Sequence, residues 1–157
     1  MRRQGQAASA VLEEQPGHLI RRLQQIAVAL FLEETQPYGI TPVQYAALQA
    51  AQRQPGLDQR TLAGAIGLDT STIAGVIDRL ERRGLIERRA SPTDRRVRLL
   101  LPTAAGQTLL AQVVPGMLKA QRRILAPLPA AQRAQFLALL KTLVESNNAL
   151  SRAPSDG

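Results

Sequence analysis

The sequence contains no cysteine, a single histidine and few aromatic residues. The absence of cysteine excludes disulfides, thiolate metal sites and a cysteine redox switch. His18 by itself cannot build a histidine-rich metal site, so we expect no metal and no cofactor. Aromatic residues make up 3% of the 157 residues, although 45% are hydrophobic. The core must therefore be built from Leu, Ile, Val and Ala, which favours packed helices.

Long apolar runs are also missing. No run approaches the roughly 18 residues needed to span a bilayer, and the N-terminus lacks the apolar region of a signal peptide. We therefore expect a cytoplasmic protein without a membrane partner. We recognise no nucleophile with its base, no metal cluster and no phosphate-binding glycine loop, so we do not expect an enzyme.

Basic residues exceed acidic ones, which gives a formal net charge of +8. An excess of this size attracts polyanions, either nucleic acid or an acidic membrane surface. Eight of the 20 basic residues, all arginines, fall between Arg79 and Arg98, together with only three acidic residues. This clustering favours nucleic acid as the partner.

The first half of the chain predicts four helices. Apolar residues recur at helical spacing from about 16 to 36. Thr41, Pro42 and Gln44 fit an N-cap, a first-turn proline and a reciprocal capping residue for a second helix that ends near Gln54.

Asp58 and Asp69 are well placed to cap a third and a fourth helix, which we expect to end near Gly67 and Gly84. Leu57 fits a hydrophobic staple at the start of the third helix. Two capped helices joined at a glycine predict a helix-turn-helix.

The second half predicts a hairpin followed by two helices. The runs LIERRAS and VRLLL read as two strands that form a wing. The pattern is helical again from Thr103 to about Leu128, where Pro115 and Gly116 predict a kink or a break. A last helix should follow Pro129.

The expected fold class is mainly α with a small β-hairpin, in one domain. The terminal segments are polar or small, and we expect them to be loose. The expected parts are tails at 1–15 and 151–157 around a domain at 16–150, in which a winged helix-turn-helix lobe at 41–102 is flanked by helices at 16–36 and 103–150.

The run from Leu62 to Gly106, with LERRGLIER followed by Asp94, Arg96, Thr103 and Gly106, resembles the DNA-binding core of the MarR family of bacterial regulators. The resemblance implies a winged helix-turn-helix transcriptional repressor that works as a homodimer on a pseudo-palindromic site in double-stranded DNA. IAVALFLEET followed by GITPVQYAAL resembles the subgroup that represses genes for aromatic-acid breakdown, which implies release by a small anionic aromatic effector.

One face of the fourth helix should enter the major groove, because its apolar stripe (Ile73, Val76, Ile77 and Leu80) must face inward. The residues expected to contact DNA from this helix are Thr70, Ser71, Thr72, Ala74, Gly75, Arg79 and Arg82. An ordinary solvated helix face is the alternative. Asp78 would be repelled by DNA unless it accepts from cytosine or pairs with an arginine such as Arg82, and we expect the pairing.

In the wing, a salt bridge between Asp94 and Arg96 would hold the loop while Arg95 or Arg96 enters the minor groove. The resemblance supports this use of the wing. Arg88, together with Arg89 and Arg98, would meet phosphates from the strands. A basic hairpin that only increases solubility is the alternative.

The helices outside the lobe carry more apolar surface than the lobe can cover, and a second copy or an intramolecular bundle would cover it. Arg22, one turn after His18, lies beside apolar residues and needs an anion. Glu33, Glu34, another chain's carboxylate or the carboxylate of an effector would serve. The residues considered as ligand contacts, against an ordinary structural network, are His18, Arg22, Tyr38 and Tyr45.

Other functions fit the same basic hairpin. A ligand-independent activator or an architectural DNA-binding protein would use it as well as a repressor would. A helical protein-interaction module would leave the arginine hairpin unexplained.

Overall fold

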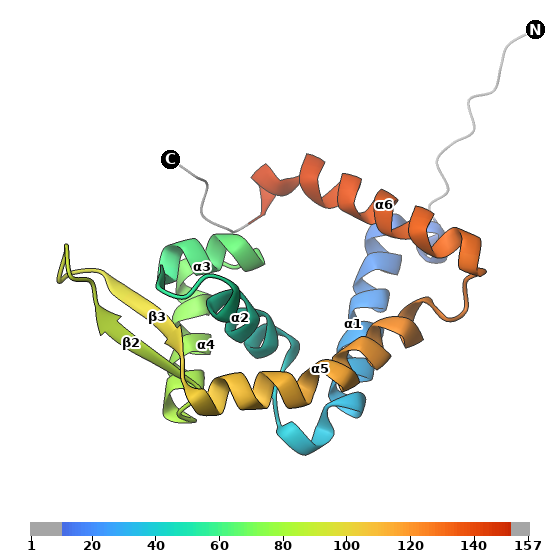
Figure 1. Ribbon diagram of the computed structural model, residues 1–157. Helices are drawn as coiled ribbons and strands as arrows, with labels where there is room; N and C mark the ends of the chain where they lie inside the picture. Colours follow the sequence, from blue (N-terminus) through green and yellow to red (C-terminus); the bar gives the residue numbers. More distant parts are fainter. Residues whose placement is uncertain (1–10, 152–157) are drawn as a thin grey trace, which may run out of the picture.

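The computed structural model describes residues 11–151 and is mainly helical (Figure 1). The helices are α1 (Pro16–Glu34), α2 (Pro42–Arg53), α3 (Gln59–Ile66), α4 (Thr70–Arg82), α5 (Ala104–Leu125) and α6 (Ala130–Ser146). The strands are β1 (Leu57–Asp58), β2 (Ile86–Ala90) and β3 (Arg98–Pro102). Short 3-10 turns span Leu12–Glu14, Gln36–Tyr38 and Asn148–Leu150. The order of helices and strands confirms the expected fold class.

Two clusters of buried side chains hold the chain together. The first lies between α2, α3, α4 and the sheet, and it includes Leu62, Ile77 and Leu100, none of which is exposed. The second lies where α1, α2 and α5 meet, around Phe31 and Val113. Helix α6 contributes no buried residue and stands away from the winged part of the molecule (Figure 1). In the described part of the chain, no helix is long and apolar enough to cross a membrane.

The capping residues fix the starts of the helices as expected. The side-chain oxygen of Thr41 accepts from the backbone N–H of Gln44 at 3.1 Å, and the Gln44 side chain accepts from the Thr41 N–H at 3.2 Å. Asp58 and Asp69 each accept from an N–H of the first turn at 2.7 Å. Gly84, just after α4, has a φ of +69°, the left-handed conformation that glycine adopts without strain.

The sheet has three strands, whereas the sequence predicted two. Strand β3 lies between β1 and β2, antiparallel to both, and Leu57 pairs with Leu100. Because β1 is two residues long, it shows no alternation of apolar and polar residues. Leu57 packs against the core as part of strand β1, whereas the sequence predicted only a hydrophobic staple at the start of α3.

Helix α5 continues through Pro115 without a break, and Figure 1 shows it bending near its middle. Pro115 and Ala111, whose carbonyl loses its helical donor, are both exposed, so water can satisfy that carbonyl. At Gly116 the helix touches α1, and a Cβ there would clash with the backbone oxygen of Glu34. Glycine therefore permits the close approach of α5 to the end of α1.

Three boundaries differ from the sequence prediction. Helix α1 ends at Glu34, because Thr35 closes its last turn with both its N–H and its hydroxyl on the Phe31 carbonyl. Helix α6 ends at Ser146, before a 3-10 turn. The tail expected at 1–15 already turns at Leu12–Glu14. The remainder of that tail and most of the tail at 151–157 lie outside the described residues.

Candidate DNA-binding surface and ligand cavity

Helix α4 buries its apolar stripe and exposes the opposite face. Ile73, Ile77 and Leu80 are fully buried, and Val76 is 6% exposed. On the other side the exposed residues are Thr70, Ser71, Thr72, Asp78, Arg79 and Arg82, while Ala74 and Gly75 are half-buried. The inward-facing stripe is therefore confirmed, and the residues expected to meet DNA lie together on the accessible face.

The hydroxyl groups of the first turn are held by the carboxylate of Asp69. Ser71 Oγ donates to Asp69 Oδ1 at 2.8 Å, and Thr72 Oγ1 donates to Oδ2 at 3.0 Å. Because both protons point to Asp69, the lone pairs of these oxygens remain for an incoming donor. At Gly75 a Cβ would meet nothing within 4 Å, so the space in front of the helix is open.

Asp78 pairs with Arg88 and not with Arg82. The distance from Arg88 Nη2 to Asp78 Oδ1 is 2.6 Å, whereas Arg82 donates through Nε to the backbone oxygen of Asp78 at 3.3 Å. The expected pairing with an arginine is correct, but the expected partner is wrong. Spacing along a helix indicated Arg82, because the sequence does not show that β2 packs against α4.

Arg88 is largely enclosed by polar groups. Its Nη1 also meets Glu81 Oε1 at 3.0 Å, Nη2 lies 3.4 Å from Gln59 Oε1, and its side chain is 22% exposed. Burial lowers its pKa, but the hydrogen bond and charge of Asp78 and the charge of Glu81 outweigh this, so the pKa of Arg88 lies above its ordinary value. The phosphate contact expected for Arg88 therefore competes with three partners in the protein.

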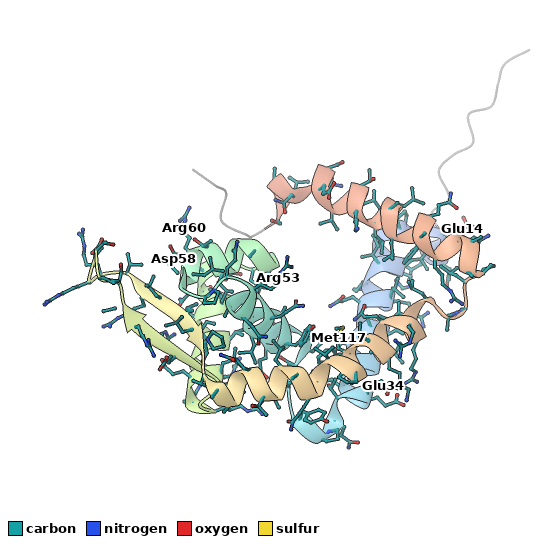
Figure 2. The ribbon with its side chains drawn as sticks, viewed as in Figure 1. Glu14, Glu34, Arg53, Asp58, Arg60 and Met117 are labelled. Atoms are coloured by element: carbon teal, nitrogen blue, oxygen red, sulfur yellow. The ribbon has the colours of Figure 1, made fainter. Side chains whose placement is uncertain are left out.

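The wing loop is held by Asp94, as the sequence indicated. Its Oδ1 accepts from the Arg96 N–H at 3.0 Å and from Arg96 Nε at 3.2 Å. Arg95 is exposed, and the Arg96 side chain is 92% exposed. Arg89 pairs with Glu87 at 2.6 Å and keeps 65% of its side chain exposed. The loop projects beyond the body of the molecule, with side chains extending from its tip (Figures 1 and 2).

The candidate ligand residues fall into two groups. Tyr38 and Tyr45 share the cluster between α1, α2 and α5, where the Tyr45 ring lies 5.7 Å from the Phe31 ring. His18 and Arg22 lie nearer the start of α1, and Arg22 is nine residues before Phe31, or about 14 Å along a helix. One chain therefore does not bring His18 and Arg22 together with Tyr45.

Tyr45 has an unsatisfied hydroxyl group. The residue is 9% exposed, and its hydroxyl is buried without a hydrogen-bond partner in the described part of the protein. Burial raises the pKa of Tyr45 above its ordinary value, so the hydroxyl stays protonated and remains available as a donor. A buried polar group without a partner is costly, and a bound polar molecule would relieve that cost.

Glu33 and Glu34 do not pair with Arg22, which corrects two of the partners considered from the sequence. Glu34 accepts from Lys119 at 3.0 Å and from Arg123 at 2.7 Å, and Arg123 also meets Glu33 at 3.1 Å. The hydrogen bond from Lys119 lowers the pKa of Glu34 despite partial burial, and Arg123 adds to the effect. These pairs fasten α1 to α5. Within residues 11–151, Arg22 has no ion-pair partner.

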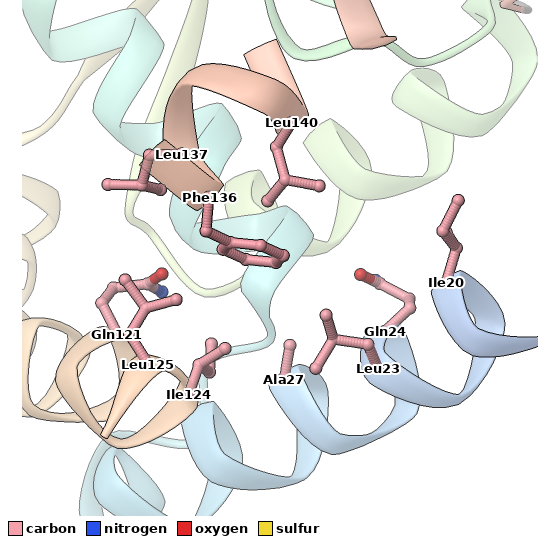
Figure 3. A pocket seen from close by; sticks show the side chains of 10 residues that line it. All are labelled: Ile20, Leu23, Gln24, Ala27, Gln121, Ile124, Leu125, Phe136, Leu137 and Leu140. Carbon is pink, nitrogen blue, oxygen red and sulfur yellow. The ribbon is translucent and has the colours of Figure 1, made fainter. Parts of the chain in front are cut away.

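A cavity of about 450 Å³ opens where α1, α5 and α6 meet (Figure 3). Its lining is apolar apart from two glutamines, and the Phe136 ring points into it from α6. The lining residues are Ile20, Leu23, Gln24, Ala27, Gln121, Ile124, Leu125, Phe136, Leu137 and Leu140. The sequence does not predict this cavity, because the cavity depends on how three separate helices cross.

Comparison with known proteins gives consistent matches. The MarR family model matches residues 40–97. The chain is 37% identical over 133 residues, 84% of this chain and 80% of the other, to a Thauera aromatica protein described as a transcriptional regulatory protein for the hcr operon.

Three solved structures share the fold over most of the chain. PcaV of Streptomyces coelicolor, in complex with its natural ligand, is 39% identical over 88% of this chain and 98% of that one, with a TM-score of 0.79. The repressor CouR of Rhodococcus jostii RHA1, bound to a 23-mer DNA duplex, is 28% identical over 89% and 99%, with a TM-score of 0.80.

The third structure, BpsR of Bordetella bronchiseptica, concerns regulation of DNA binding by 6-hydroxynicotinic acid. It is 31% identical over 83% of this chain and 94% of that one, with a TM-score of 0.79. Sequence identity and shared fold extend over most of the described residues, and the family model matches residues 40–97 within them. The chain therefore belongs to the MarR family of winged-helix transcriptional regulators.

Proposed function

We propose that the protein is a cytoplasmic, homodimeric repressor that binds a pseudo-palindromic DNA operator and leaves it when a small aromatic acid binds. The observation that carries the proposal is the surface formed by α4 and the wing. Helix α4 has an exposed face with small residues and open space at Gly75, and it packs against β2, the first strand of the wing, whose projecting loop carries exposed arginines. This pairing suits one major groove and the neighbouring minor groove.

Helix α4 supplies the base contacts in this proposal. Ser71 and Thr72 have their hydroxyl protons on Asp69, so their oxygens accept from amino groups of cytosine or adenine. Thr70, Ala74 and Gly75 line the same face, which admits base edges closely. Arg79 and Arg82 on α4 would contact phosphates or guanine. The wing would contact phosphates or the minor groove through Arg89, Arg95, Arg96 and Arg98.

The apolar surface of α6 supports the homodimer. Leu139, Leu143 and Val144 are 57%, 54% and 65% exposed, and no residue of α6 is buried. Contiguous apolar surface of this kind marks an interaction site in a soluble protein. A second copy related by a two-fold axis would cover it and would place two α4 helices about one DNA turn apart.

The buried hydroxyl of Tyr45 supports an effector site near α2. An aromatic acid would stack against Tyr38 or Tyr45 and would give this hydroxyl a partner. In our proposal His18 and Arg22 bind the carboxylate from the second copy of the dimer, because within one chain they are too far from Tyr45. The structure of BpsR supports a ligand of this class, since it concerns 6-hydroxynicotinic acid, and the complex of PcaV with its natural ligand supports the presence of an effector site.

The direct test measures binding of the purified protein to the promoter fragment of its own gene, followed by titration with aromatic acids and their coenzyme A thioesters. The proposal expects a short palindromic footprint that disappears with at least one of these compounds. Continuous coverage of the fragment would indicate an architectural protein instead. A footprint that no compound in the panel releases would remove the effector from the proposal.

A further inference from the structure

One guanidinium group joins three elements of the DNA-binding surface. Arg88 projects from β2, the first strand of the wing, and meets Asp78 and Glu81, which lie one turn apart on α4. The same nitrogen that meets Asp78 also lies 3.4 Å from the amide oxygen of Gln59, at the start of α3. Both terminal nitrogens of Arg88 thus have partners on the helices of the helix-turn-helix. We refer to Arg88, Asp78 and Glu81 as the clamp.

The clamp places two carboxylates where the DNA backbone would repel them. Asp78 and Glu81 are 53% and 43% exposed on α4, and Arg88 can neutralise only one of their two charges. A surface selected only for attraction to phosphate would lack these carboxylates. Their contribution to DNA binding must therefore come from what they hold, which is the base of the wing.

The clamp crosses the joint between the two elements that meet DNA. Helix α4 and strand β2 are connected through a turn at Gly84, so their relative orientation depends on contacts across that turn. The apolar contacts of Ile86 bury the wing base, but such contacts are not directional. A guanidinium held by two carboxylates fixes direction as well as distance. The grooves of a duplex have a fixed spacing, so an error in this angle misplaces Arg95 and Arg96.

We propose that Arg88 is a positioning residue, which sets the angle of the wing relative to α4 and does not itself bind phosphate. The proposal rests on the DNA-binding function proposed above. It makes a prediction opposite to that of simple electrostatics: removing the carboxylates of the clamp weakens specific binding, although the protein becomes more positive.

The first experiment uses the double variant Asp78→Asn, Glu81→Gln and two duplexes. One duplex carries the site that the wild-type dimer selects from random sequences, and the other has the same length and a scrambled sequence. We expect affinity for the selected site to fall by about tenfold, while affinity for the scrambled duplex stays equal or rises. The control, Glu87→Gln, removes a carboxylate from the same strand as Arg88 without touching the clamp, and should not weaken either complex.

The second experiment compares Arg88→Gln with its neighbour variant Arg89→Gln. Each variant loses one positive charge, but only Arg89 is mostly exposed. For the scrambled duplex, Arg89→Gln should reduce the slope of log affinity against log salt by about 1, whereas Arg88→Gln should leave it unchanged. For the selected site, Arg88→Gln should lose about as much as Asp78→Asn, Glu81→Gln, and the triple variant should lose no more, because the three residues act as one unit.

Three outcomes separate the possibilities. Tighter binding of Asp78→Asn, Glu81→Gln to the selected site, or a reduced salt slope in Arg88→Gln, would overturn the positioning role and leave the DNA-binding function standing. A wild-type protein that selects no site would instead overturn the proposed function. Thermal unfolding of every variant, with binding measured well below the midpoint, separates a loss of specificity from a loss of fold.

Discussion

The winged part of the chain and helix α6 differ in where their apolar side chains lie. In the winged part, Leu62, Ile73 and Leu80 are completely buried within one chain. In α6, Leu139 and Val144 are more than half exposed, and no residue is buried. The winged part thus has a core of its own, whereas the apolar side chains of α6 stay largely uncovered within residues 11–151. The difference indicates that a monomer suffices to fold the winged part, and it agrees with the proposal that a second copy covers α6.

The largest expected effect comes from disrupting the proposed contact between α6 and a second copy of the chain. The double variant Leu139→Glu, Leu143→Glu should leave a folded monomer and lower affinity for a palindromic site by about 10² to 10⁴-fold, because the second half-site no longer adds to the first. Sedimentation velocity and a DNA titration measure both effects. The control Lys141→Glu changes the net charge of α6 by the same amount and should remain dimeric. A double variant that stays dimeric would contradict the interface.

The next effect concerns the core of the winged part. Leu80→Ala should reduce the free energy of unfolding by about 2 to 5 kcal/mol, because a fully buried leucine leaves a cavity. Leu150, which is 84% exposed, serves as the control, and Leu150→Ala should change stability by less than about 0.5 kcal/mol. Urea titration checks both values, and equal losses would mean that the core has been misplaced.

Alanine substitutions at two glycines should have smaller effects on stability, and of opposite sign. At Gly116 a Cβ would clash with the Glu34 backbone, so Gly116→Ala should cost about 1 to 3 kcal/mol and loosen the contact of α1 with α5. At Gly75 nothing lies within 4 Å, so Gly75→Ala should stabilise α4 by about 0.5 to 1 kcal/mol. The same methyl group should weaken DNA binding, since it stands on the face proposed to meet the bases. Thermal melts and DNA titrations of both variants provide the measurement.

The smallest expected effects are in the wing. Arg95→Ala and Arg96→Ala should each weaken DNA binding and reduce the salt slope by about 1, while the dimer remains intact. Arg96→Ala should lose more than Arg95→Ala, because Arg96 also bonds to Asp94 and shapes the loop. Unchanged affinity in both variants would contradict the role of the wing.

Local sequence signals predicted most of the winged part. Thr41, Asp58 and Asp69 mark the helix starts, because capping depends only on residues within one turn. The inward stripe of α4 follows from helical periodicity in the same way. Strand β1 was missed because two residues carry no period, and its pairing with β3 depends on contacts between distant segments.

The candidate sites were predicted less well, because their geometry depends on contacts between elements. The bond between Asp94 and Arg96 was predictable from a short loop. The partner of Asp78 was not, since Arg88 reaches it from another element. The separation of Arg22 from Tyr45 depends on which end of α1 packs against α2. The cavity between α1, α5 and α6 likewise requires three crossing helices to be known.

The proposed function requires that two copies present two α4 helices to one duplex. The most direct measurement is a hydroxyl-radical footprint on the selected site, combined with the stoichiometry of the complex. We expect two protein chains per duplex and protected segments about 10 base pairs apart on one face of the DNA. A single bound chain, or protection without this spacing, would contradict it.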